Sequence, residues 1–167
     1  MFEIIFCTAV IIAFIIILFS VMLKHCSMRE IIVVSSKEAS LKPEKIIPPR
    51  KYVFINPFTE NYCYLSFDSM LISIVEDIFG SDNTEESFSA LVAVSPNSQY
   101  WPYAAKCLAG LSKQDIMDIA ENIIRAELKE ISKTESLLDF YRKDNYEKYF
   151  DQINKKLNKV GLELLDI

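Results

Sequence analysis

The sequence IIFCTAVIIAFIIILFSVML occupies Ile4–Leu23 and contains no charged residue, no proline and no glycine. At about 1.5 Å of rise per residue, a helix of this length covers roughly 30 Å, which is the thickness of the hydrocarbon core of a bilayer. A helix also satisfies its own backbone hydrogen bonds in lipid. The stretch therefore predicts a single transmembrane helix over about residues 4–23, within an N-terminal anchor segment of residues 1–29.

A cleaved signal peptide is the alternative for this stretch. Such a peptide has a basic region before a shorter apolar run and a small-residue cleavage site after it. Here only Met1, Phe2 and Glu3 precede the run, and Lys24–Arg29 follows it. We therefore expect a retained anchor. Because the flanking Lys and Arg residues all lie on the carboxyl side, a single-pass membrane protein with its carboxyl-terminal domain in the cytoplasm is predicted.

The composition of the remaining chain narrows the possible partners. Residues 24–167 carry 18 Lys and Arg against 22 Asp and Glu. A nucleic-acid partner is not expected, because affinity for a duplex depends on clustered cations that neutralise phosphates. The three glycines of the chain are too few for a glycine-rich phosphate loop. The length after the apolar stretch suits one domain with its own core.

The cysteines and the single histidine suggest neither a metal site nor a cofactor site. Cys7, Cys26, Cys63 and Cys107 are far apart in the sequence, and His25 directly follows the apolar stretch. Zinc sites need clustered ligands at short spacing. Cys63 and Cys107 are expected to be buried small hydrophobes. Cys26, three residues past the apolar stretch, is a candidate for reversible acylation, and an unmodified thiol is the alternative.

Residues 30–50 predict a short strand followed by a connector. Ile31–Ser35 is rich in β-branched residues, whereas Lys37–Arg50 holds three prolines and four basic residues. Cations near a bilayer favour anionic headgroups. The candidate headgroup contacts in and before this region are Lys24, Arg29, Lys42 and Lys45. A solvated linker without a role in lipid binding is the alternative for the connector.

Residues 51–167 predict an α+β domain, with short strands first, helices next and a final strand that returns to the sheet. The expected strands are 52–56, 62–67, 70–75, 88–94 and 162–167, with a hairpin around Gly80–Asn83. The expected helices, about four in number, are 102–108, one that begins after Ser112, a brief one from Thr134 to Phe140, and 145–159. Ser112 and Asp115 are close to a capping box, and Gly161 suits a left-handed helix end.

Catalytic patterns are not found in this sequence. A Ser-His-Asp or Cys-His arrangement needs a histidine within the domain, and His25 lies beside the apolar stretch. The acidic pairs Glu85–Glu86 and Asp115/Asp118 suit a solvated charged surface, whereas acid–base carboxylates need a partly buried cleft. The chain is not expected to be an enzyme.

A set of patterned segments covers about residues 50–167, namely Tyr52–Phe58, Tyr64–Phe67, Ser89–Val94, Ala104–Ile116, Ala120–Ile131, Thr134–Asp144 and Tyr149–Ile167. In their order and spacing these segments resemble the SPFH or band 7 superfamily (stomatin, prohibitin, flotillin and HflK-C), and flotillins above all.

The resemblance implies a catalytically inert, membrane-anchored scaffold with an SPFH-like domain over residues 51–167. Proteins of this superfamily form homo-oligomers on a lipid bilayer, organise membrane microdomains and in some cases regulate membrane proteases. Flotillins continue beyond the last strand into a long coiled coil, and here the sequence stops at Ile167. The expected partners are therefore lipid and further copies of this chain or a longer flotillin-like protein. The alternative is an adaptor or regulator of a membrane protease or another client membrane protein, without large oligomers.

Overall fold

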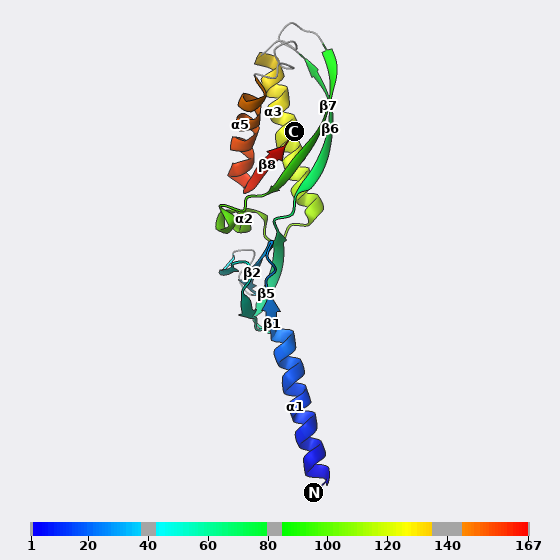
Figure 1. Ribbon diagram of the computed structural model, residues 1–167, viewed down its shortest axis with the longest axis vertical. Helices are drawn as coiled ribbons and strands as arrows, with labels where there is room; N and C mark the ends of the chain where they lie inside the picture. The colour runs from blue at the N-terminus through cyan, green and yellow to red at the C-terminus, as the bar shows by residue number, and fades with distance from the viewer. Residues whose placement is uncertain (1, 38–42, 80–84, 135–144, 167) are drawn as a thin grey trace. The chain divides into compact units, whose positions relative to one another are not determined.

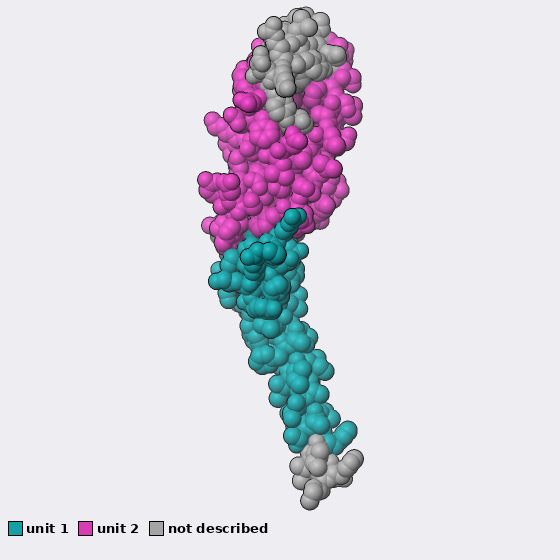
Figure 2. Space-filling view, in the orientation of Figure 1, with its two compact units in different colours: residues 1–65 teal, residues 66–167 magenta. Residues whose placement is uncertain are grey.

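A computed structural model describes residues 2–37, 43–79, 85–134 and 145–166. The chain forms two units, residues 1–65 and residues 66–167 (Figure 2). The sequence suggested a domain that starts at residue 51, whereas the structure divides after Leu65. Residues 51–65 therefore belong with the N-terminal unit.

Helix α1 (Phe2–Met22) opens the first unit and leads into the short strand β1 (Leu23–His25) (Figure 1). The prediction of a transmembrane helix is wrong: among the residues that the structure describes, no helix combines the length and the apolar character needed to cross a membrane. The helix ends at Met22, one residue before the apolar sequence ends, because Leu23 already pairs with Phe54 in strand β4.

Two small sheets follow α1 in the first unit. Strand β1 pairs with β4 (Tyr52–Phe54), and β2 (Glu30–Ser36) pairs with β3 (Lys45–Ile47) on one side and with β5 (Glu60–Ser66) on the other. Their shared core contains Cys26, Ile32, Val34, Ile47, Val53 and Ile55. The strands β2, β4 and β5 confirm three sequence predictions. Strands β1 and β3 were missed, and β3 lies within the segment that was predicted as a connector.

The second unit is an α+β domain with one antiparallel sheet of order β6-β7-β8. Strands β6 (Met70–Phe79) and β7 (Glu85–Pro96) pair over ten residues, which confirms the predicted hairpin, although its turn lies outside the described residues. Strand β8 (Leu162–Asp166) pairs with β7, with a register shift between Ala93 and Val94. The predicted return of the final strand to the sheet is thus confirmed.

Three helices of the second unit lie where the sequence predicted them. They are α2 (Trp101–Leu108), α3 (Lys113–Thr134) and α5 (Tyr146–Leu157), and a short 3₁₀ turn, η2 (Asn158–Val160), follows α5. Helix α3 packs on β6, and α5 packs on α3 and β8 (Figure 1). The brief helix predicted from Thr134 to Phe140 begins at the last residue of α3 and otherwise falls outside the described residues.

Local hydrogen bonds and backbone geometry fix the helix ends. The Ser112 main-chain N–H donates to Asp115 Oδ2 over 2.9 Å, and the Asp115 N–H donates to Ser112 Oγ over 3.1 Å. This reciprocal pair is the predicted capping box. Gly161 ends η2 with φ +79°, and a Cβ added there would lie 2.6 Å from Ala104 Cα. Glycine therefore serves both a left-handed turn and a close approach to α2.

Candidate functional site

The surface of α1 is the most unusual feature of the first unit. Every side chain from Phe6 to Val21 is exposed, and most of them are large and apolar. Phe6, Phe14 and Ile16 are 64%, 66% and 62% exposed. Such a contiguous apolar surface indicates an interaction site, because folded proteins rarely leave so much apolar area in contact with water.

An aromatic cluster lies where α1 meets the small sheets, and we call it the aromatic collar. It comprises Phe19, His25, Tyr52, Phe54, Tyr62 and Tyr64. The register of β1 and β4 places Leu23 opposite Phe54 and His25 opposite Tyr52. Directly opposed residues in an antiparallel pair share one face of the sheet. This pairing brings His25, Tyr52 and Phe54 together, whereas Phe19 comes from α1 and Tyr62 and Tyr64 come from β5.

The rings of the collar contact one another in three pairs. The centroids of Phe19 and Phe54 lie 5.6 Å apart, and those of His25 and Tyr52 lie 4.6 Å apart. Tyr62 and Tyr64 meet edge to face at 5.8 Å. These separations fall in the range of favourable aromatic pairs. Tyr52, Phe54 and Tyr64 nevertheless stay 67%, 48% and 46% exposed, so the collar presents aromatic surface to its surroundings.

The predicted headgroup-contact residues lie at separate places. Lys24 belongs to the collar, because its Nζ lies 5.2 Å from the centroid of the Tyr62 ring, within cation–π range. Arg29 is exposed in the turn before β2, and Lys45 is exposed on β3. Lys42 lies outside the described residues. The structure thus joins Lys24 to aromatic side chains and places Arg29 and Lys45 on other segments of the same unit.

Cys26, the predicted acylation site, is fully buried in the core of the first unit. Its thiol donates a hydrogen bond to the Glu30 carbonyl over 2.8 Å, and its main-chain N–H donates to the Lys51 carbonyl over 2.9 Å. Burial raises the pKa of the Cys26 thiol. Acylation of Cys26 stays a prediction, and it would require the sulfur to leave this core.

We expect the folded protein to protect Cys26 from alkylation. A raised pKa lowers the fraction of reactive thiolate, and burial blocks access of the reagent. Brief treatment with N-ethylmaleimide at pH 7.5 should label the exposed Cys107 and should label Cys26 at a rate at least about tenfold lower. Peptide mass spectrometry measures the labelling of each thiol. Unfolding in urea should remove the difference. Equal labelling of the two thiols in the folded protein would contradict the buried position of Cys26.

The prediction that Cys107 is buried is wrong, and the phase of α2 explains why. The inward face of this helix consists of Ala104, Ala105 and Leu108, and Cys107 is exposed beside them. Cys63 is half-buried on β5. The apolar residues around Cys107 therefore predicted helix α2 correctly, but they did not show which side of the helix Cys107 occupies.

In the second unit, an ion-pair cluster joins α3 to strand β6. Arg125 Nη1 lies 2.6 Å from Glu76 Oε2, Arg125 Nη2 lies 2.7 Å from Glu121 Oε1, and Lys129 Nζ lies 2.7 Å from Glu76 Oε1. Hydrogen bonds from Lys129 and Arg125 lower the pKa of Glu76, and bonds to Glu121 and Glu76 raise the pKa of Arg125. The cluster keeps its charges paired and fastens the helix to the sheet.

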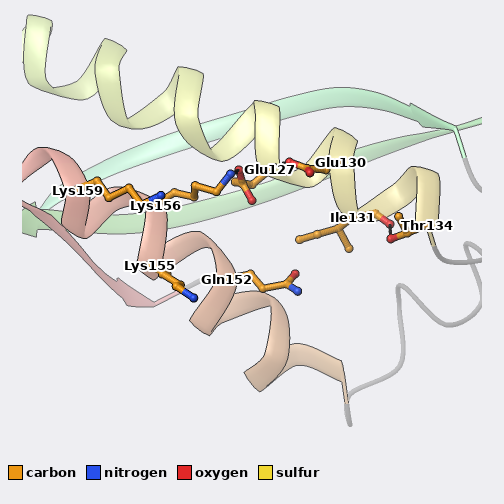
Figure 3. Close-up of a pocket in the computed structure, with 8 residues that line it drawn as sticks. All are labelled: Glu127, Glu130, Ile131, Thr134, Gln152, Lys155, Lys156 and Lys159. Atoms are coloured by element: carbon orange, nitrogen blue, oxygen red, sulfur yellow. Dashed lines mark hydrogen bonds and ion pairs between the residues drawn. The ribbon is translucent and has the colours of Figure 1, made fainter.

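A groove of about 410 Å³ lies between α3 and α5. Figure 3 shows Lys156 of α5 directed toward Glu127 of α3, and their N–O distance is 2.7 Å. The bond to Glu127 raises the pKa of Lys156. This salt bridge connects the two helices across the groove. Because it engages both charges, Glu127 and Lys156 do not offer a free acid–base pair. The acidic residues Asp115 and Asp118 are exposed, as the sequence predicted.

The sequence analysis missed the aromatic collar, because β1 is a three-residue strand without a readable period and its pairing with β4 joins residues distant in the sequence. The alternation of Tyr62, Cys63 and Tyr64 was a usable signal, since alternate residues of a strand share one face. The chain matches no protein-family model, and the search of curated proteins finds no significant match.

Proposed function

We propose that this protein is a lipid-associated scaffold of the flotillin type that associates with further copies of itself. The exposed apolar surface of α1 is the observation that carries the proposal. Removing apolar surface from water is favourable by roughly 25 cal/mol per Å². A lipid surface would cover these side chains and so supply this energy.

The aromatic collar and the charge distribution support a lipid partner. Aromatic side chains with a polar group, such as Tyr52 and Tyr64, suit the region between headgroups and hydrocarbon. Residues 24–65 carry seven Lys and Arg against four Asp and Glu, whereas residues 66–167 carry eleven against eighteen. The excess of cations beside the collar suits anionic headgroups. The ordered resemblance to flotillins over residues 50–167 supports the scaffold part of the proposal.

Flotation with vesicles tests the lipid part. The full chain is mixed with phosphatidylcholine vesicles that contain phosphatidylserine and is centrifuged through a density gradient. The wild type should float with the vesicles. Replacing Ile12 and Ile16, which are 52% and 62% exposed, by lysine should reduce the vesicle-bound fraction about 100-fold, because each buried isoleucine contributes about 1.5–3 kcal/mol. The control, Ser69→Lys with Asn122→Lys at exposed positions of the second unit, should float normally.

Cross-linking on the same vesicles, followed by sizing, tests the self-association part. Covalent oligomers of the wild type are expected at low protein-to-lipid ratio. Wild-type protein that stays in the aqueous fraction would overturn the lipid part. A vesicle-bound wild type that yields only monomers would overturn the scaffold and favour an adaptor or regulator of another membrane protein.

A further inference from the structure

Strand β6 lies at one edge of the described sheet in the second unit, and a side chain of α3 binds its main chain there. The sheet order is β6-β7-β8, and α3 packs on β6 (Figure 1). Arg125 Nη1 donates a hydrogen bond to the Val75 carbonyl over 2.6 Å. Glu76 and Glu121 hold the same guanidinium at 2.6 and 2.7 Å. Arg125 is thus fixed by three partners, one of which is the main chain of β6.

Strand β8 lies at the other edge of the described sheet, and a side chain of α5 binds its main chain in a similar way. Helix α5 packs on β8. The Leu164 main-chain N–H donates a hydrogen bond to Asn154 Oδ1 over 3.1 Å. Asn158 Nδ2 donates to the same oxygen over 3.4 Å. Each edge strand therefore carries a main-chain hydrogen bond to the helix that packs on it.

The strand register places both of these main-chain groups on the side away from β7. In an antiparallel pair, directly opposed residues either bond to each other or both point away from each other, and the two kinds alternate along the strand. Because the Leu164 N–H bonds to α5, the opposite residue Val94 points away from β8 and toward β6. Ser89 has the other orientation in the alternation along β7, so its partner Val75 points away from β7. The two bonds therefore occupy outward groups at the two edges.

Strand β6 begins with a sequence that would pair readily with other strands. The six residues Met70–Val75 (MLISIV) include no charged residue, no proline and no glycine. Segments of this kind stack into cross-β assemblies when they are exposed at a sheet edge. Leu71 and Val75 are also 61% and 57% exposed. An edge of β6 without a bound side chain would therefore favour association with strands of other chains.

We propose that α3 and α5 close the two edges of this sheet to strands of other chains, with Arg125 at β6 and Asn154 at β8. This closure is independent of the proposed function. An added strand would lie about 4.8 Å from the edge strand, where it would have to displace these side chains. At β6 it would replace a charge-assisted hydrogen bond by a neutral one. At β8 a carbonyl of the added strand would have to replace Asn154 Oδ1.

Arg125→Met tests the β6 edge, and Lys129→Met is the matched control. Lys129 lies on the same helix and pairs with the same carboxylate, Glu76, over 2.7 Å, so its replacement removes the same charge and spares the bond to Val75. The full chain is kept in dodecylmaltoside micelles, which cover the apolar surface of α1. We expect thioflavin-positive assembly of Arg125→Met at least about tenfold faster than that of the wild type, because an open edge templates strand pairing. Lys129→Met should assemble at the wild-type rate.

Loss of stability is a separate cause of assembly, and Ile153→Ala distinguishes it from an open edge. Ile153 is 0% exposed on α5 and takes no part in the two edge bonds. All variants are compared at a temperature at which near-ultraviolet circular dichroism shows them folded. Folded Ile153→Ala should assemble no faster than the wild type. An Arg125→Met variant that assembles at the wild-type rate, or no faster than Ile153→Ala, would overturn the proposal at β6.

Amide hydrogen exchange in the same micelles tests the β8 edge. Asn154→Leu removes the acceptor of the Leu164 N–H, whereas Asn154→Asp retains an oxygen at this position. We expect the exchange rate of the Leu164 amide to rise at least about fivefold in Asn154→Leu and to change less than about twofold in Asn154→Asp, because this bond protects the outward N–H. Asn154→Leu should also assemble faster than Asn154→Asp. Unchanged exchange in Asn154→Leu, or equal assembly of the two variants, would overturn the proposal at β8.

Discussion

Ile153→Ala is expected to destabilise the second unit by about 2–5 kcal/mol, which is the usual range for truncating a buried isoleucine. Ile153 lies on α5, between α3 and β8, and is 0% exposed. Its loss removes apolar contacts and leaves a cavity that the helix can only partly close. Urea unfolding measures the change through Trp101, the single tryptophan of the chain, which belongs to the second unit.

Asp151→Ala provides the control for this substitution. Asp151 is on the same helix and is exposed, so its replacement should change the free energy of unfolding by no more than about 0.5 kcal/mol. Equal midpoints for the two variants would show that Ile153 does not belong to the core.

Gly161→Ala is expected to lower the free energy of unfolding by about 2–5 kcal/mol. Two effects contribute, and the same substitution at Gly110 distinguishes them. Gly161 has φ +79°, and an added Cβ would lie 2.6 Å from the main-chain Cα of Ala104. Gly110 has the similar φ of +83°, but a Cβ there would meet nothing within 4 Å. Gly110→Ala should therefore show only the cost of the left-handed backbone, about 1–2 kcal/mol.

The difference in the free energy of unfolding between the two alanine variants gives the cost of placing a Cβ where α2 closely approaches the turn after α5. It should be about 1–3 kcal/mol, the range for overpacking a filled site. The same tryptophan measurement reports both variants. A Gly161→Ala variant as stable as Gly110→Ala would mean that α2 and the η2 turn are not packed as the structure has them.

Long segments with a clear pattern were predicted well from the sequence. The spacing of Ile116, Ala120 and Ile124 predicted α3, and all three residues are buried. The capping pair at Ser112 and Asp115 located the start of this helix. Strands β6 and β7 were predicted too short, because their distal ends are polar. Glu76 extends β6 there because Arg125 and Lys129 of α3 neutralise it, and such a tertiary contact leaves no trace in local sequence.

The first unit was predicted less well, for reasons of length and register. Three-residue strands such as β1 and β3 are too short to show a hydrophobic period. They form because Leu23 pairs with Phe54 and Lys45 pairs with Val34, which are not their neighbours in the sequence. The same pairing ends α1 at Met22, before the apolar sequence ends. The burial of Cys26 also depends on these partners, since Ile47 and Val53 of β3 and β4 complete its core.

The position of β8 has a consequence for biosynthesis. Its partner β7 ends at Pro96, and β8 begins only at Leu162. A β6–β7 hairpin that forms before the intervening helices and β8 are synthesised has one edge of β7 open. Loops of this length close slowly compared with local hairpins and helices. The nascent chain thus exposes that edge to chaperones and to neighbouring nascent chains until Leu162–Asp166 emerges.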